Sequence, residues 1–271
     1  MSTFKQRLPK HDTLFIPFIT AGDPHEDVTI ELALALQKEG ASVLELGVPY
    51  SDPLADGPII QAASSRALAQ GMSISKAIKL VPKMRKKGVE IPIILFTYFN
   101  PVLQLGLESF FALVRENEID GVLVPDLPYE ESTEIRTLAE QNEVAYISMV
   151  APTSKERIEK ISKDATGFLY CVSSLGVTGI RETLPEDLDS FLKEVKASTS
   201  IPVAVGFGIS TSHQVEVLKE YTDGIVIGSA IVHKVAELQS VLLNKETRSE
   251  GIASFQAYIA SIVSPIQKCE V

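Results

Sequence analysis

Eight apolar runs alternate along this chain with segments that have the character of helices. Their Val-, Ile- and Leu-rich composition is typical of parallel strands that are covered on both faces. Eight strand–helix repeats in about 250 residues predict an α/β protein with a (β/α)8 barrel, and a doubly wound open sheet is the alternative. The runs are LFIPFIT (14–20), SVLELG (42–47), IPIILFTY (91–98), GVLVPD (121–126), VAYISMV (144–150), GFLYCV (167–172), IPVAVGFG (201–208) and GIVIG (224–228).

The segments between the runs carry helix boundary signals. Pro24 suits a first helical turn and Gly40 a helix end, while Ser73 or Ser75 suits the cap of a helix within 73–88. No linker or low-complexity tract interrupts the alternation, so we expect residues 1–271 to form a single barrel domain. Further helices are expected around 106–117, 130–141, from about 154, 186–197, 211–220 and after 228.

Composition excludes several classes of protein. The sequence has no uninterrupted apolar run of membrane-spanning length and no signal-peptide pattern at its start. Its two cysteines fit a reducing cytoplasm, and a net charge of −10 argues against a nucleic-acid surface. We therefore expect a cytoplasmic protein that binds neither a membrane nor nucleic acid. A phosphorylated small molecule remains compatible, because backbone N–H groups can hold phosphate without net positive charge.

Two connections are longer than is usual between a strand and the next helix. They span residues 48 to about 57 and residues 173–185, and each follows the end of a predicted strand. Active sites of (β/α)8 barrels are built on this face, so both loops are candidate lids over a site.

Glu45 is an acid within a hydrophobic strand. Because side chains alternate along a strand, Val43, Glu45 and Gly47 should point into the barrel, and Leu44 and Leu46 should face the helices. One interpretation is a structural carboxylate satisfied by backbone donors. The other is a general acid/base whose pKa is adjusted by an apolar pocket.

Asp56 lies in the loop DPLADGP. Asp before Gly is ordinary turn chemistry, so the residue is weak evidence on its own. Pro49, Pro53 and Pro58 restrict the backbone of this loop, however. A stiff loop would hold a carboxylate against a ligand with little loss of chain entropy.

Glycine-containing loops follow the last two strands and predict a phosphate site. Loops after strands seven and eight form the recurring phosphate site of this fold. Here they contain Gly206, Gly208, Gly228 and Ser229, and Gly179 in the loop after strand six could close over the same group. A lone glycine pair would more often be a tight turn, but two such loops at these two strands favour a site.

Aromatic side chains gather near the strand ends. They are barrel core or the walls of a pocket for a planar apolar ligand, and the residues are Phe18, Phe96, Tyr98, Tyr170 and Phe207. None of the four histidines lies in a metal-ligand pattern, so we expect no metal site.

These motifs, taken together, resemble one family. LELGVPYSDPLADGP (44–58) closely resembles the hallmark stretch of the alpha subunit of tryptophan synthase. The likeness covers roughly residues 4–265. The chain departs from the family at Tyr50, which replaces a phenylalanine, and at Ser174-Leu175 before GVTG. Both departures bear on the lid and on partner coupling. Other matching stretches are PFITAGDP (17–24), VLVPDLP (122–128), SSLGVTG (173–179), GFGIS (206–210) and GSAIV (228–232).

The resemblance implies a lyase that cleaves indole-3-glycerol phosphate to indole and glyceraldehyde 3-phosphate. It implies that Glu45 is the catalytic acid/base, that Asp56 stabilises the indole N–H, and that Tyr170 lies near the glutamate. The implied indole pocket contains Phe18, Phe96, Leu123 and Phe207. The implied phosphate contacts are Gly179, Gly208, Gly228 and Ser229, with Thr178 as the threonine of the closing loop.

The family also implies a partner. Its alpha subunit binds a beta subunit in an alpha2beta2 complex and passes indole to it, so pyridoxal phosphate is expected in the partner and no cofactor in this chain. The loops at Ser51-Asp52-Pro53 and Pro128-Tyr129 would face that partner. Two alternatives stay open, a barrel that mainly activates the beta subunit and a stand-alone lyase that releases indole. A phosphosugar isomerase of the same fold is disfavoured, because its site would not need this acid pair in an aromatic pocket.

Overall fold

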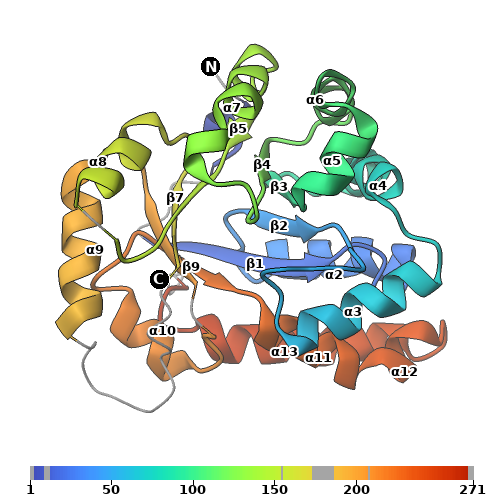
Figure 1. Cartoon of the computed structure of the whole chain (residues 1–271). Coiled ribbons are helices and arrows are strands. Elements are labelled where there is room, and N and C mark those ends of the chain that lie inside the picture. The colour runs from blue at the N-terminus through green and yellow to red at the C-terminus, as the bar shows by residue number, and fades with distance from the viewer. Residues whose placement is uncertain (1–2, 9–12, 154, 173–185, 207, 268–271) are drawn as a thin grey trace.

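A single parallel sheet forms the centre of the molecule (Figure 1). The computed structural model describes residues 3–8, 13–153, 155–172, 186–206 and 208–267. The strands follow the order β5-β4-β3-β2-β1-β9-β8-β7-β6. Their bounds are β1 (Leu14–Thr20), β2 (Leu44–Gly47), β3 (Ile93–Phe96), β4 (Gly121–Leu123), β5 (Ala145–Tyr146), β6 (Ser148–Val150), β7 (Leu169–Val172), β8 (Val203–Gly206) and β9 (Gly224–Ile227).

The two outermost strands of this order are neighbours in the chain. β5 and β6 are separated only by Ile147, whose N–H donates to the carbonyl oxygen of Val122 at 2.9 Å. The sheet therefore closes on itself, which confirms the barrel and rules out the open sheet. Its fifth predicted strand, 144–150, is divided in two because its first part pairs with β4 and its second part with β7.

Helices surround the strands (Figure 1). The expected helices are found, and α1, α3 and α5 occupy segments for which the sequence predicted no element. The bounds are α1 (Thr3–Arg7), α2 (Glu26–Lys38), α3 (Pro58–Ala69), α4 (Ile74–Lys86), α5 (Phe99–Leu105), α6 (Leu107–Glu116), the 3₁₀ turn η1 (Tyr129–Glu131), α7 (Thr133–Gln141), α8 (Lys155–Asp164), α9 (Glu186–Ser198), α10 (Ser212–Leu218), α11 (Ser229–Glu237), α12 (Gln239–Leu243) and α13 (Arg248–Val263).

Helix boundaries follow local chemistry. The Ser73 hydroxyl accepts from the N–H of Lys76, so Ser73 caps α4 as predicted. Gly40 follows α2 with a φ of 85°, a conformation that glycine adopts without strain. Pro24 was expected in the first turn of α2, but it lies before the helix. It precedes the cap residue His25, whose side chain accepts from the N–H of Asp27.

The strands separate two apolar layers. Val43 belongs to the barrel interior together with Ile16, Ile94 and Val226, while Leu44 and Leu46 pack in the larger layer beneath the helices. The predicted alternation along β2 is therefore confirmed.

The N-terminal helix lies at the amino ends of the strands. The ring of Phe4 packs on Phe168, just before β7, with 6.3 Å between ring centroids. Arg7 and Arg85 both bind the carboxylate of Asp120, which also accepts from the N–H of Ile93 at 2.9 Å. Packing and ion pairs close the barrel at the amino ends of its strands. A site is therefore expected at the carboxyl ends.

Candidate active site

A cavity of about 270 Å³ opens at the carboxyl ends of the strands. Its lining comes from β1, β2, β3, β6, β7, β8 and β9, from loops after β2, β4, β8 and β9, and from the starts of α3 and α11. Of the predicted site residues within the described ranges, all but one line this cavity. Those that line it are Phe18, Glu45, Asp56, Phe96, Tyr170, Gly208, Gly228 and Ser229. The other predicted residues, Thr178, Gly179 and Phe207, lie outside the described part of the chain.

Leu123 is the predicted residue that does not line the cavity. It ends β4 and is fully buried in the interior apolar layer with Ile94 and Ile147. The loop that follows β4 supplies Pro125 to the cavity wall instead. Leu123 pairs in register with the cavity-lining Phe96, and its contact with a ligand stays a prediction.

Glu45 is buried between apolar neighbours. In the strand register it lies beside Phe18 of β1 and Ile94 of β3, and it is 1% exposed. Its Oε1 has no hydrogen-bond partner within the described chain. Removal from water raises the pKa of Glu45 to about 8. The carboxyl group is therefore largely protonated near neutral pH. Because its pKa lies close to that pH, its carboxylate form can also accept a proton.

Tyr170 faces the same cavity as Glu45. Burial, and then the charge of ionised Glu45, hold the pKa of Tyr170 well above its usual value, so its phenol stays neutral. Gly206 on the neighbouring β8 leaves room for this side chain. A Cβ at Gly206 would overlap the hydroxyl of Tyr170 and lie 2.9 Å from its Cζ.

Asp56 enters the cavity from the loop between β2 and α3. Its backbone oxygen accepts from Gln61 Nε2 at 2.7 Å, which ties the loop to the first turn of α3. The side chain is half-buried. Burial raises the pKa of Asp56, while a hydrogen bond from Tyr98 opposes that rise. Asp56 is thus less buried than Glu45 and has a phenol donor, so the two carboxyl groups in one cavity differ in environment.

The side of the cavity formed after β8 and β9 has open backbone donors. Gly228 precedes α11, and within the described part of the chain no side chain caps the first turn of this helix. The neighbouring α10 differs, because Thr211 and Gln214 satisfy its end reciprocally in a capping box. The first N–H groups of α11, together with Ser229, are therefore available to an anion.

An aromatic wall forms a further part of the cavity, and its Phe18 lies next to Gly228. The rings of Phe18 and Phe96 meet edge to face with 5.5 Å between centroids, and Phe96 meets Tyr98 in the same way at 6.5 Å. Besides Ala55 and Pro125, the apolar lining residues that the sequence did not predict are Ile60, Met149, Val172 and Val226. Met149, Val172 and Val226 lie on strands at or near their carboxyl ends, a position that the sequence could have indicated.

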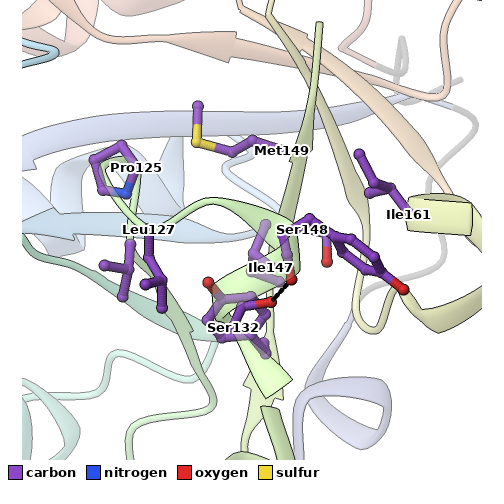
Figure 2. Close-up of a pocket in the computed structure, with 10 residues that line it drawn as sticks. Pro125, Leu127, Ser132, Ile147, Ser148, Met149 and Ile161 are labelled. Carbon is purple, nitrogen blue, oxygen red and sulfur yellow. Dashed lines mark hydrogen bonds between the residues drawn. The ribbon is translucent and has the colours of Figure 1, made fainter. Parts of the chain in front are cut away.

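A second, smaller cavity of about 40 Å³ lies behind the candidate site (Figure 2). Pro125 and Met149 line both cavities and so form the wall between them. Figure 2 shows Met149 and Ser148 on opposite sides of β6. The Ser132 hydroxyl donates to the carbonyl oxygen of Tyr129 at 2.7 Å, marked by the dashed line.

Within the described ranges, no group of three or more His, Cys, Asp and Glu side chains is arranged to hold a metal ion. Over the same residues, no helix combines the length and the apolar character needed to cross a membrane.

Comparison with known proteins identifies the family. The family model for the tryptophan synthase alpha chain matches residues 4–261. The chain belongs to the tryptophan synthase alpha chain family. Among curated members, the tryptophan synthase alpha chain of Geobacillus sp. (strain WCH70) is 64% identical over 94% of this chain and 97% of its own length. That of Bacillus subtilis (strain 168) is 58% identical over 94% and 96%.

Solved alpha-chain structures of this family have the same fold. The alpha subunit from Legionella pneumophila str. Paris is 32% identical and superposes with a TM-score of 0.86 over 98% of both chains. A Pyrococcus furiosus chain is 34% identical, with a TM-score of 0.83 over 94% of this chain and 99% of its own. It comes from a study of mutual activation in the tryptophan synthase α2β2 complex.

Proposed function

We propose that this chain is the alpha subunit of tryptophan synthase and cleaves indole-3-glycerol phosphate to indole and glyceraldehyde 3-phosphate. Family membership supports the activity. The observation that carries the proposal is one cavity holding a buried Glu45 with a pKa of about 8, a half-buried Asp56 and the open end of α11. We further propose that the chain acts as one barrel domain.

Glu45 performs both proton transfers in this mechanism. As a carboxylic acid it protonates the indole ring carbon that bears the glycerol chain, which makes that carbon a leaving group. As the resulting carboxylate it accepts the proton of the adjacent hydroxyl while the carbon–carbon bond breaks and the aldehyde forms. The raised pKa suits both roles, because the group is protonated before the first step and its conjugate base is strong enough for the second.

Asp56 stabilises the charge that this protonation creates. The positive charge of the protonated ring is shared with the ring nitrogen, whose N–H donates to the Asp56 carboxylate. Phe18 and Phe96 pack on the ring and exclude water, which strengthens that interaction. At the other end of the substrate, the N–H groups of α11 and the Ser229 hydroxyl bind the phosphate.

A beta subunit is the proposed partner. We expect an α2β2 complex in which this chain passes indole on and the beta subunit carries the pyridoxal phosphate. The strongly exposed Leu54, in the same loop as Asp56, gives the loop an apolar contact for that partner. We also propose a cytoplasmic location, which the sparse cysteine usage favours.

Indole release from indole-3-glycerol phosphate, measured with and without a beta subunit, tests the proposal. We expect slow release by the chain alone and faster cleavage in the complex. A chain that is inactive in both states but stimulates the beta subunit would instead be an activator. A chain that releases indole at the same high rate with and without the beta subunit would be a stand-alone lyase.

A further inference from the structure

Tyr98 is a fully buried phenol next to the candidate site. It follows β3 and caps α5, and it is 1% exposed. It does not line the cavity that holds Glu45 and Asp56. Its ring is fixed on two sides, by Tyr50 stacked at 5.2 Å and by Phe96 edge to face at 6.5 Å.

The hydroxyl of Tyr98 joins two consecutive residues of the catalytic loop. The backbone N–H of Ala55 donates to the Tyr98 oxygen at 3.1 Å. The same hydroxyl lies close enough to the carboxyl group of Asp56 to lower the pKa of that group against the effect of burial. The oxygen accepts from Ala55, so the hydroxyl has one proton to offer, and Asp56 is the carboxyl group beside it.

The start of the loop is held against the same ring. Tyr50 stacks on Tyr98, and the Tyr50 hydroxyl accepts from Asn100 Nδ2 at 3.0 Å. Tyr98 therefore contacts the loop at Tyr50 and again at Ala55 and Asp56. These contacts hold both ends of the loop that carries Asp56. The Asp56 side chain must be aligned with a ligand in the cavity.

We propose that Tyr98 is a positioning residue, which orients the Asp56 carboxylate toward the ring N–H through its hydroxyl and has no contact with substrate. This inference rests on the proposed function. The charged and titratable groups that face the pair are Asp126 after β4, whose carboxylate accepts from the N–H of Phe99 at 2.9 Å, and Glu45 and Tyr170 in the cavity.

Tyr98→Phe tests the proposal, because it keeps the ring and its stacking but removes the hydroxyl. We expect kcat for indole formation to fall about 10- to 100-fold, in line with the loss of a hydrogen bond to a charged group, with KM changed much less. Tyr146→Phe is the matched control, since it removes a buried phenol hydroxyl outside the cavity, and it should leave kcat unchanged.

The double variant separates positioning from packing. If Tyr98 acts through Asp56, adding Tyr98→Phe to Asp56→Asn should lower kcat little further. A full multiplicative loss in the double variant would overturn the proposal, as would wild-type kcat in Tyr98→Phe.

A measurement that needs no activity keeps this inference distinct from the proposed function. The carboxyl carbon of Asp56 can be titrated by NMR in the wild type and in Tyr98→Phe. Loss of the donor should raise the pKa of Asp56, and an unchanged value would contradict the proposal. A wild-type chain that forms no indole would remove the proposed function, while the titration would still decide whether Tyr98 holds Asp56.

Discussion

Gly47 leaves open the space that the ring of Phe18 fills. The two residues lie on adjacent strands, and a Cβ on Gly47 would overlap Cζ of Phe18 and lie 2.6 Å from its Cε2. Phe18 is also the strand neighbour of Glu45 and part of the cavity wall. The absent side chain at Gly47 therefore sets where the aromatic wall stands relative to the buried carboxyl group.

Gly47→Ala should displace the Phe18 ring. We expect a loss of about 1–3 kcal/mol in the free energy of unfolding, typical of overpacking, measured by urea denaturation. Indole formation should fall as well, because the ring moves within the cavity. Adding Phe18→Leu should recover part of the lost stability. If the double variant lost as much unfolding free energy as the two single variants lose together, the two residues would not be in direct contact.

The raised pKa of Glu45 makes stability depend on pH. Between the unfolded value of 4.5 and the folded value of about 8, the folded chain keeps a proton that the unfolded chain has released. This group therefore lowers the free energy of unfolding by up to about 1.4 kcal/mol per pH unit as pH rises through that window.

Glu45→Gln removes this dependence, since the amide resembles the neutral acid and does not titrate. Urea denaturation at pH 5, 6.5 and 8 should show the variant gaining stability relative to the wild type as pH rises. A difference that stays constant across the three pH values would mean that Glu45 is not desolvated in solution.

An ion pair between Arg66 and a buried carboxylate attaches α3 to the first loop of the barrel. Arg66 binds the carboxylate of Asp23 through Nε at 2.7 Å and a terminal nitrogen at 2.8 Å, and the Asp23 side chain is 2% exposed. Arg66→Met should cost about 3–5 kcal/mol of unfolding free energy, because it leaves a buried carboxyl group without its partner. The double variant with Asp23→Ala should be more stable than Arg66→Met alone. A cost for Arg66→Met below about 1 kcal/mol would indicate an ordinary surface pair.

Leu54 should contribute to binding the beta subunit. It is 84% exposed and lies in the loop that carries Asp56. We expect Leu54→Asp to weaken the complex about 10-fold or more in isothermal titration, because it places a charge in an apolar contact. The matched control is Leu243→Asp on α12, another exposed leucine, which should bind normally. Equal effects of the two substitutions would argue against a contact at Leu54.

The sequence predicted features that follow from local periodicity. The direction of Glu45 depends only on the alternation of β2, and the cap of α4 depends on Ser73 close by in the chain. The proline-rich loop was given an end near Gly57, but no helix was predicted after it, although Pro58 suits a first helical turn and starts α3. The sequence could not show that Leu123 packs with Ile94 and Ile147 while its register neighbour Phe96 lines the cavity, because both contacts depend on the closed barrel.

Properties that depend on distant segments could not be read from the sequence. The pKa of Glu45 is set by burial beside Phe18 and Ile94, on strands that lie 27 residues before and 49 residues after it in the chain. The contact between Tyr98 and Asp56 likewise joins a strand end to a loop far earlier in the sequence. Sequence reasoning listed Tyr98 only as one of several aromatic residues near strand ends.

Proton transfer by Glu45 is the central claim, and indole formation by purified Glu45→Gln tests it most directly. The measurement is steady-state indole release from indole-3-glycerol phosphate, compared with the wild type in the presence of the beta subunit. We predict a loss of at least about 10²–10⁴-fold, since the amide can neither give the first proton nor accept the second. Binding of glyceraldehyde 3-phosphate and the urea midpoint at pH 5 should be retained. Turnover near that of the wild type in a folded Glu45→Gln chain would contradict the account.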